Sequence, residues 1–340
     1  MGATSGSGKG ALVVDDRAAQ QGARTEVVRY EHDPEGYLPV VCVCDITHTM
    51  SRQNETKLNW LQRNLPEGLV VDAGWLEARG YSRALRSKYV ARGWLDSVAR
   101  GAYLRPSARL MASGEGPALH WQNVVISLQT LLERPLVVGG RTALELQGLA
   151  HYLGASGPRE IHLYGDAPPP AWVGKLGLAA SFVFHNAGRL FGNKLITPAE
   201  AAIGARLCDW KHDADLRQSG LICETWGHWD WPLVLSTPER AILELLDGVP
   251  QRETFHQADV LMEGLHNLSP RRLHELLVAC HSVKVKRLFL WFAERHEHAW
   301  LKRLDRRGVD LGRGKRMLVR GGRLDAKFHI TVPENLDAAG

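Results

Sequence analysis

Hydrophobic residues in the stretch 57–106 repeat first at helical and then at alternating spacing. The segment "KLNWLQRNL" places its leucines on one helix face, which predicts a helix over 57–65. Asp72 stands before "AGWLEAR" and Ser82 before "RALRSKYVAR", and a glycine follows each segment. Because Asp and Ser are favoured N-caps and glycine is favoured after a helix end, the pattern predicts two further helices.

Two short alternating segments, "WLDSV" and "AYLRP", complete this stretch. The "ARG" between them contains a glycine that permits a tight reversal, so the two segments predict a β-hairpin. Helix, helix, capped helix and hairpin follow one another in the order of a winged helix-turn-helix. In that design the capped helix enters the DNA major groove, and the hairpin tip touches the flanking backbone.

From residue 111 onward, longer apolar segments alternate between helical and strand-like spacing. The predicted elements are a helix at 118–132, strands at 135–140, 159–165 and 180–186, helices at 143–153 and 235–246 capped by Thr142 and Thr237, and helices at 269–281 and 283–296. Strands with intervening helices, followed by clustered helices, are typical of a mixed α/β or α+β domain with a helical C-terminal part.

The pattern divides the chain into four parts. Residues 1–50 show no sustained helical or strand period and are rich in small and polar residues, so we expect a disordered or optional tail. Residues 51–110 form the predicted winged helix-turn-helix, 111–333 the larger domain, and 334–340 a short C-terminal tail.

Composition narrows the class of protein. The chain of 340 residues has no apolar run long enough for a membrane helix and no signal-peptide layout at its N-terminus. Its five cysteines do not suggest a disulfide framework. We therefore expect a soluble, cytoplasmic protein with no membrane partner. The sequence shows no signature of a glycosidase, protease, kinase or nuclease, so we expect no enzymatic activity.

Charge is segregated along the chain, although the net charge is only +5. Residues 57–110 carry a net charge of +6 and residues 271–327 one of +10, whereas residues 111–270 carry −6. Such blocks favour contact with a polyanion, most often nucleic acid. The first block coincides with the predicted winged helix, where positive charge would neutralise the phosphates of double-stranded DNA.

A helical wheel of "RALRSKYVAR" separates an apolar side, which contains Tyr89, from a polar side available to DNA. Side chains at the edges of the packed face are better placed for phosphates than for bases, and the wing turn adds one more base. The predicted DNA-binding residues are Arg83, Arg86 and Ser87 on the polar side, Lys88 and Arg92 at its edges, and Arg100 in the wing. A winged helix that serves only protein–protein contacts is the alternative.

Two glycines at 139–140, between a predicted strand and a predicted helix, could bind an anion at the helix N-terminus. A tight turn capped by Thr142 is the favoured interpretation, because the third glycine and the lysine of a phosphate loop are absent.

Cysteine and histidine pairs could hold zinc, but their spacing lacks the tight C-x-x-C of a strong zinc motif. The pairs are Cys208 with His212 and Cys223 with His228. Buried cysteines and ordinary polar histidines are the favoured interpretation, so we expect no metal and no other cofactor.

The segment "WGHWDWP" surrounds His228 and Asp230 with three tryptophans. The two polar residues could act as an acid–base pair, but no nucleophile or second carboxylate stands in a recognisable relation to them. Tryptophan packing at the edge of a sheet is the favoured interpretation.

The second basic block, 271–327, interleaves its Arg and Lys residues with apolar ones. Solvated faces of a helix pair would account for this pattern. A second polyanion surface, which contacts either flanking DNA or an RNA, accounts for it equally well.

Three separated sequence blocks resemble the AbiEi antitoxins of type IV toxin–antitoxin systems. The blocks are "LPEGLVVDAGWLEARGYSRALRSKYVARGWLDSVARGAYLRP", "VVGGRTALELQGLAHYL" and "STPERAILELL", and the resemblance spans residues 57 to about 333. It implies an N-terminal winged helix that represses its own operon by binding operator repeats in the promoter. It also implies a C-terminal domain that counteracts a nucleotidyltransferase toxin without a stable complex.

Carried over by position, the resemblance assigns DNA contacts to the basic residues of the predicted capped helix and wing. Family members often have an apolar residue where this chain has Arg86, which sets that position apart. Two other functions are compatible with the sequence alone. One is a plain winged-helix transcriptional regulator whose large domain senses a ligand or mediates oligomerisation. The other is a nucleic-acid enzyme that uses the His228 and Asp230 region or a zinc ion.

Overall fold

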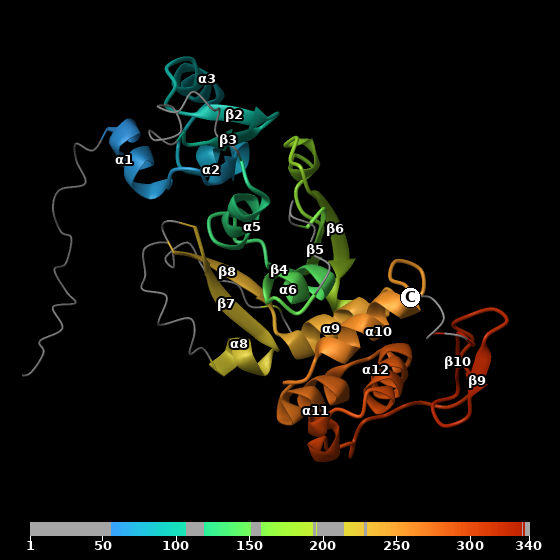
Figure 1. Cartoon of the computed structure of the whole chain (residues 1–340). Helices are drawn as coiled ribbons and strands as arrows, with labels where there is room; N and C mark the ends of the chain where they lie inside the picture. The colour runs from blue at the N-terminus through green and yellow to red at the C-terminus, as the bar shows by residue number, and fades with distance from the viewer. Residues whose placement is uncertain are drawn as a thin grey trace, which may run out of the picture. The chain divides into compact units, whose positions relative to one another are not determined.

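The computed structural model describes most of the chain that follows the predicted N-terminal tail (Figure 1). The described residues are 56–106, 119–150, 158–192, 195, 214–227, 230–334 and 336. All of them belong to one compact unit, Thr56–Gly340. The predicted tail 1–50 lies outside the described residues, as do Cys208, His212 and His228.

The first part of the described chain is a small module of three helices and three strands. Its helices are α1 (Lys57–Asn64), α2 (Ala73–Ala78) and α3 (Arg83–Ala91), and its strands are β1 (Val70–Asp72), β2 (Asp96–Ala99) and β3 (Ala102–Leu104). Strand β3 lies between β1 and β2 and is antiparallel to both. This is the winged helix-turn-helix that the sequence predicts, with one additional strand, β1.

Both predicted N-caps of this module form. The carboxylate of Asp72 accepts a hydrogen bond from the Trp75 N–H at 2.8 Å, and the hydroxyl oxygen of Ser82 accepts one from the Leu85 N–H at 3.3 Å. Gly80, with φ +82°, reverses the chain between α2 and α3 in the left-handed region that glycine tolerates. The local sequence therefore fixes where α3 begins.

Aromatic side chains fill the interior of the winged helix. Tyr81 and Tyr89 are almost fully buried, and their rings meet edge to face with centroids 6.0 Å apart. Trp94, which follows α3, meets Tyr89 in the same way at 5.1 Å. Edge-to-face rings of this kind favour one orientation, so they hold α3 at a defined angle to the rest of the module.

A five-stranded mixed sheet forms the centre of the larger domain. Its strands are β4 (Leu136–Val138), β5 (Glu160–Gly165), β6 (Ser181–Asn186), β7 (Leu221–Trp226) and β8 (Trp231–Ser236), in the order β6-β5-β4-β8-β7. The pairs β5–β6 and β4–β8 are parallel, and the other neighbours are antiparallel. Its accompanying helices are α5 (Trp121–Gln129), α6 (Gly140–Leu146) and α8 (Ala214–Gln218), with short 3-10 helices η2 (Val173–Lys175) and η3 (Ala187–Arg189).

Helix α5 connects the winged helix to this sheet. The hydroxyl of Ser127 accepts a hydrogen bond from the Val70 N–H in β1 at 2.8 Å. Two residues further on, the buried amide of Gln129 donates to the carbonyls of Leu136 and Val234 and accepts from the Val234 N–H. Buried polar groups that are fully paired in this way fix both neighbours of the helix.

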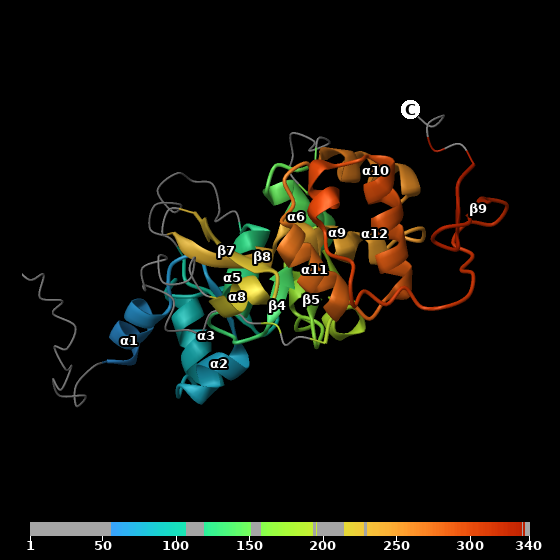
Figure 2. The ribbon, with the colours of Figure 1, turned by 90° about the horizontal axis from the view of Figure 1, so that it is seen from below.

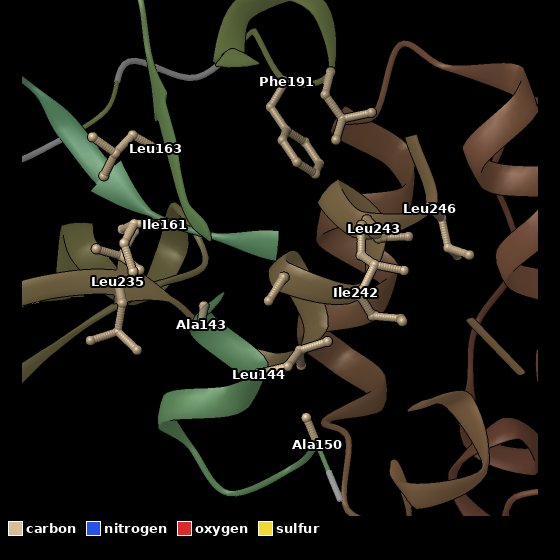
Figure 3. Packing of buried hydrophobic residues seen from close by; sticks show 14 of the residues in the cluster. Ala143, Leu144, Ala150, Ile161, Leu163, Phe191, Leu235, Ile242, Leu243 and Leu246 are labelled. Atoms are coloured by element: carbon tan, nitrogen blue, oxygen red, sulfur yellow. The ribbon is translucent and has the colours of Figure 1, made fainter. Parts of the chain in front are cut away.

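The remaining described chain is mainly helical (Figure 2). It contains α9 (Pro238–Asp247), α10 (Phe255–Gly264), α11 (Pro270–Ala279), α12 (Val283–Arg295), η5 (Ala299–Arg303) and the two-stranded pair β9 (Arg323–Asp325) and β10 (Ile330–Val332). Helix α9 packs against α6, α11 and α12. Figure 3 shows Ala143 and Leu144 of α6 and Ile242, Leu243 and Leu246 of α9 among the apolar residues of this core.

The block "STPERAILELL" forms the end of β8 and helix α9, and its charged residues are buried. Pro238 occupies the first helical turn as predicted, but the Thr237 side chain makes no capping hydrogen bond. Arg240 and Glu244 form an ion pair at 2.7 Å with both side chains almost fully buried. These charges therefore belong to the core. None of the helices in the described ranges has both the length and the apolar character that crossing a membrane requires.

Candidate nucleic-acid interface

Helix α3 and the β2–β3 turn present one basic surface. The side chains of Arg83, Ser87, Lys88, Arg92 and Arg100 are exposed. None of the four bases among them forms an ion pair within the described part of the chain. Gly101, with φ +83°, makes the tight turn of the wing beside Arg100. Unpaired exposed cations are free to replace the counterions of a phosphate backbone.

The charge of Arg92 is placed by the residue that follows α3. Its guanidinium lies over the Trp94 ring, 5.2 Å from the ring centroid. Because Trp94 is itself held by Tyr89, this cation–π contact keeps the guanidinium at the C-terminal end of α3. The position suits a phosphate contact at the edge of a groove.

Arg86 does not belong to this surface, and the prediction that it faces DNA is wrong. The residue is only 4% exposed. Its guanidinium donates to the Tyr81 carbonyl at 2.7 Å and to the Glu77 carboxylate at 2.8 Å, and it lies over the Tyr103 ring of β3. Burial lowers the pKa of Arg86, but hydrogen bonds to Glu77 and Tyr103 outweigh it and raise the pKa overall.

The wheel placed Arg86 wrongly because it considered only the apolar neighbours of α3. Arg86 lies one turn before Tyr89, on the side of the helix that faces the α2–α3 turn and the wing strand. A polar residue can occupy such an inner position when its donors find partners. The partners Glu77, Tyr81 and Tyr103 come from three different elements, so spacing along α3 gives no signal for them.

The glycine turn after β4 binds an anion that the chain itself provides. The Gly140 N–H donates to the buried carboxylate of Glu244 at 2.9 Å. Gly140 has φ +53°, and an added Cβ would come within 2.9 Å of the Tyr164 hydroxyl oxygen. The site is therefore closed by Glu244 and Tyr164, which supports the structural interpretation of this turn.

Thr142 is not the N-cap of α6, which corrects the prediction. The helix begins at Gly140, with Gly139 in the cap position. The Thr142 hydroxyl instead donates to the Glu160 carbonyl at 3.1 Å and accepts from the His162 N–H at 3.0 Å. It thereby ties the first turn of α6 to β5.

The residues considered for zinc and for acid–base chemistry are only partly described. Cys223 is buried in the core beside Val234, and Asp230 is exposed in the β7–β8 turn. Trp226 and Trp231 are paired across β7 and β8, at the edge of the sheet. Among the described residues no group of three His, Cys, Asp or Glu side chains is arranged to hold a metal ion.

A polar cavity of about 220 Å³ at the ends of β5 and β6 had no counterpart in the sequence analysis. The parallel register places Tyr164 beside His185, and their rings stack with centroids 4.6 Å apart. His185 Nε2 lies 2.9 Å from His162 Nδ1. Burial and the charges of Arg141 and Arg252 lower the pKa of His162 to about 4. Burial and the neighbouring His162 lower the pKa of His185 to about 4, so both rings are neutral at pH 7.

A three-stranded winged helix with a basic third helix, followed by a larger mixed domain, defines the class of winged-helix transcriptional regulators. Two family profiles agree with this class. One, described as "Transcriptional regulator, AbiEi antitoxin, Type IV TA system", matches residues 159–333. The other, described as "Transcriptional regulator, AbiEi antitoxin N-terminal domain", matches residues 54–155. The chain belongs to the AbiEi antitoxin family, whose members are regulators and not enzymes.

The match confirms the family resemblance found in the sequence. Among solved structures, the chain is similar to the RV2827C protein from Mycobacterium tuberculosis. The two are 15% identical, and the alignment covers 80% of this chain and 88% of that one with a TM-score of 0.43. A likeness at this score carries no argument about function. The search of curated proteins gave no match.

Proposed function

We propose that this protein represses its own operon and counteracts a nucleotidyltransferase toxin. The observation that carries the first half is the set of exposed, unpaired bases on α3 and the wing. The family match supports the second half, since transcriptional regulators of type IV toxin–antitoxin systems act beside a toxin. In this proposal residues 51–110 bind the operator, and residues 111–333 oppose the toxin without a stable complex.

The exposed residues have different tasks at the operator. Arg83 and Ser87 lie on the outer side of α3, where side chains reach base edges in the major groove. Lys88, Arg92 and Arg100 neutralise phosphates along the flanking backbone. Arg86 takes no direct part in binding. The proposal puts the protein in the cytoplasm, together with the DNA that it regulates.

The test separates repression from neutralisation of the toxin in one strain. The promoter drives a reporter, and the neighbouring nucleotidyltransferase gene is expressed from an inducible plasmid. We expect the double variant Arg83→Gln/Arg100→Gln to release the reporter while it still rescues growth. Arg271→Gln, which removes an exposed charge 90% accessible to solvent, is the matched control and should change neither readout. Retained repression by the double variant would contradict the assignment of α3 and the wing.

The same strain tests the second half. Full-length protein should restore growth when the toxin is induced. A plain regulator with a ligand-sensing or oligomerisation domain would repress the reporter and leave the toxin active. The family match favours the antitoxin over this alternative.

A further inference from the structure

The segment between α12 and β10 carries a cluster of unpaired positive charge. From Leu311 to Leu324 the sequence contains no acid and five bases, which are Arg313, Lys315, Arg316, Arg320 and Arg323. All five side chains are exposed, and none forms an ion pair within the described residues. We call these five residues the cationic lobe.

Bases next to the cationic lobe are neutralised by acids. Arg306 and Lys327 both bind the Glu294 carboxylate, at 2.8 and 2.6 Å. On α11 and α12, Arg271, Arg272, Lys284 and Arg295 also have acidic partners. Solvated helix faces therefore account for much of the second basic block. The lobe is the part of it whose charge stays available to a partner.

A buried arginine holds the backbone of the lobe. Arg287 of α12 is 2% exposed, and its guanidinium donates to the carbonyls of Leu311 and Gly314 at 2.7 Å each. With these two carbonyls turned inward, Arg313 and Lys315 lie on the outer surface. A loop that is already ordered loses less conformational entropy on binding than a free tail does. The lobe is therefore a prepared surface.

The composition of the lobe indicates which polyanion it fits. It combines Gly-Arg-Gly-Lys-Arg at 312–316 and Arg-Gly-Gly-Arg at 320–323 with two exposed apolar side chains, Met317 at 71% and Leu324 at 39%. Guanidinium groups bind phosphates and also stack on base faces, and glycines allow a nucleic-acid backbone to approach closely. Base faces are accessible in single strands and hidden in a duplex.

We propose that the cationic lobe binds single-stranded RNA through its phosphates and base faces. The lobe is built on α12, whereas the winged helix contacts α5, so the two nucleic-acid surfaces have separate supports. RNA is the single-stranded nucleic acid that cells contain in quantity. The inference goes beyond the proposed repression of the operon and does not depend on it.

The test measures binding of the full chain to a fluorescein-labelled, unstructured RNA of about 20 nucleotides by anisotropy. The same titrations use a DNA duplex from the promoter. Arg316→Gln/Arg320→Gln/Arg323→Gln removes three lobe charges, and Arg83→Gln/Arg100→Gln removes two from the winged helix. Arg307→Gln removes a 92% exposed arginine that is paired with Asp305, and serves as the matched control.

We expect the lobe variant to lose about tenfold or more in affinity for RNA. Its slope of log affinity against log salt should fall by about 2, since each single-strand phosphate contributes about 0.7. Affinity for the duplex should stay at the wild-type value, and the winged-helix variant should show the reverse pattern. All variants should keep the wild-type melting temperature, because every substituted side chain is exposed.

Two results would overturn the inference. One is an RNA affinity and salt slope that do not change in the lobe variant. The other is an equal loss for duplex and RNA, which would make the lobe an extension of the operator-binding surface. Arg287→Met gives a second measurement, because it removes the support of the loop and no exposed charge. It should weaken RNA binding and leave duplex binding unchanged.

Discussion

The guanidinium of Arg86 is shared between three parts of the winged helix. It donates to Glu77 at the end of α2 and to the Tyr81 carbonyl in the turn, and it lies over Tyr103 in the wing. A planar group with five donors can join several acceptors at fixed angles, which lysine cannot do. Arg86 thus sets the orientation of α3 toward α2 and the wing without a contact to DNA.

Arg86→Met should lower the free energy of unfolding by about 1–3 kcal/mol, because it leaves the buried Tyr81 carbonyl unpaired. Urea denaturation measures this loss. Glu77→Gln is the milder comparison, since the Glu77 side chain is 58% exposed and can bind water. The salt slope of operator binding should stay the same in Arg86→Met. A slope that falls by about one at unchanged stability would show that Arg86 contacts a phosphate directly.

The neutral pair His162 and His185 should make stability depend on pH. Both folded-state pKa values are about 4, below the ordinary 6.5. As pH falls from 6.5 to 4, the unfolded chain therefore takes up protons first, and the folded state loses stability across that window. Above pH 6.5 the pair costs nothing.

We expect wild-type protein to lose about 1–3 kcal/mol more between pH 7 and pH 5 than His162→Gln/His185→Gln does. This range is reduced from the full shifts because His185 is only half-buried. Urea midpoints at the two pH values provide the measurement. Equal losses in both proteins would mean that the two rings are charged in the folded state.

At the scale of elements, the sequence predicted what local chemistry determines. The caps at Asp72 and Ser82 gave the starts of α2 and α3, because a side chain three residues away satisfies the first free N–H. The three-residue strand β1 has too few positions to show alternation, and α10 and the β7–β8 pair were also missed. Thr142 was misplaced because its hydroxyl partner is on β5, a contact that only the fold creates.

The turn between β4 and α6 offers a prediction with a matched control. Gly140 and Gly148 both have positive φ, at +53° and +70°, so alanine is strained at either position. Only at Gly140 would the new Cβ meet another atom, the Tyr164 hydroxyl, at 2.9 Å. Gly148→Ala should cost about 1 kcal/mol, and Gly140→Ala about 1–3 kcal/mol more, by urea denaturation. Equal costs would show that the turn accommodates a Cβ.

At the scale of the whole molecule, the order of elements carried most of the information. The two-part architecture and the family followed from three sequence blocks and the hairpin pattern, and the family profiles match 54–155 and 159–333. The exposed positions at Arg83 and Arg100 followed from the wheel and the wing turn. Neither the burial of Arg86 nor the meeting of His162 with His185 could be predicted, because each depends on the packing of separate elements.

Removal of residues 1–49 should leave both stability and repression intact. The prediction rests on the lack of any sustained helical or strand period in that segment. A chain that starts at Met50 can be compared with the full chain by its melting transition and by the promoter reporter. Loss of the transition in the shortened chain would show that the segment contributes to the core.

The central claim is that α3 and the wing bind the promoter through exposed, unpaired bases. The most direct test titrates a labelled promoter duplex with wild-type protein and with Arg83→Gln/Arg100→Gln at several salt concentrations. The account predicts binding that weakens as salt rises, with a slope about 2 smaller in the variant, since each lost phosphate contact contributes about 0.9. A wild-type protein that ignores the duplex at low salt, or a variant with the same slope, would contradict it.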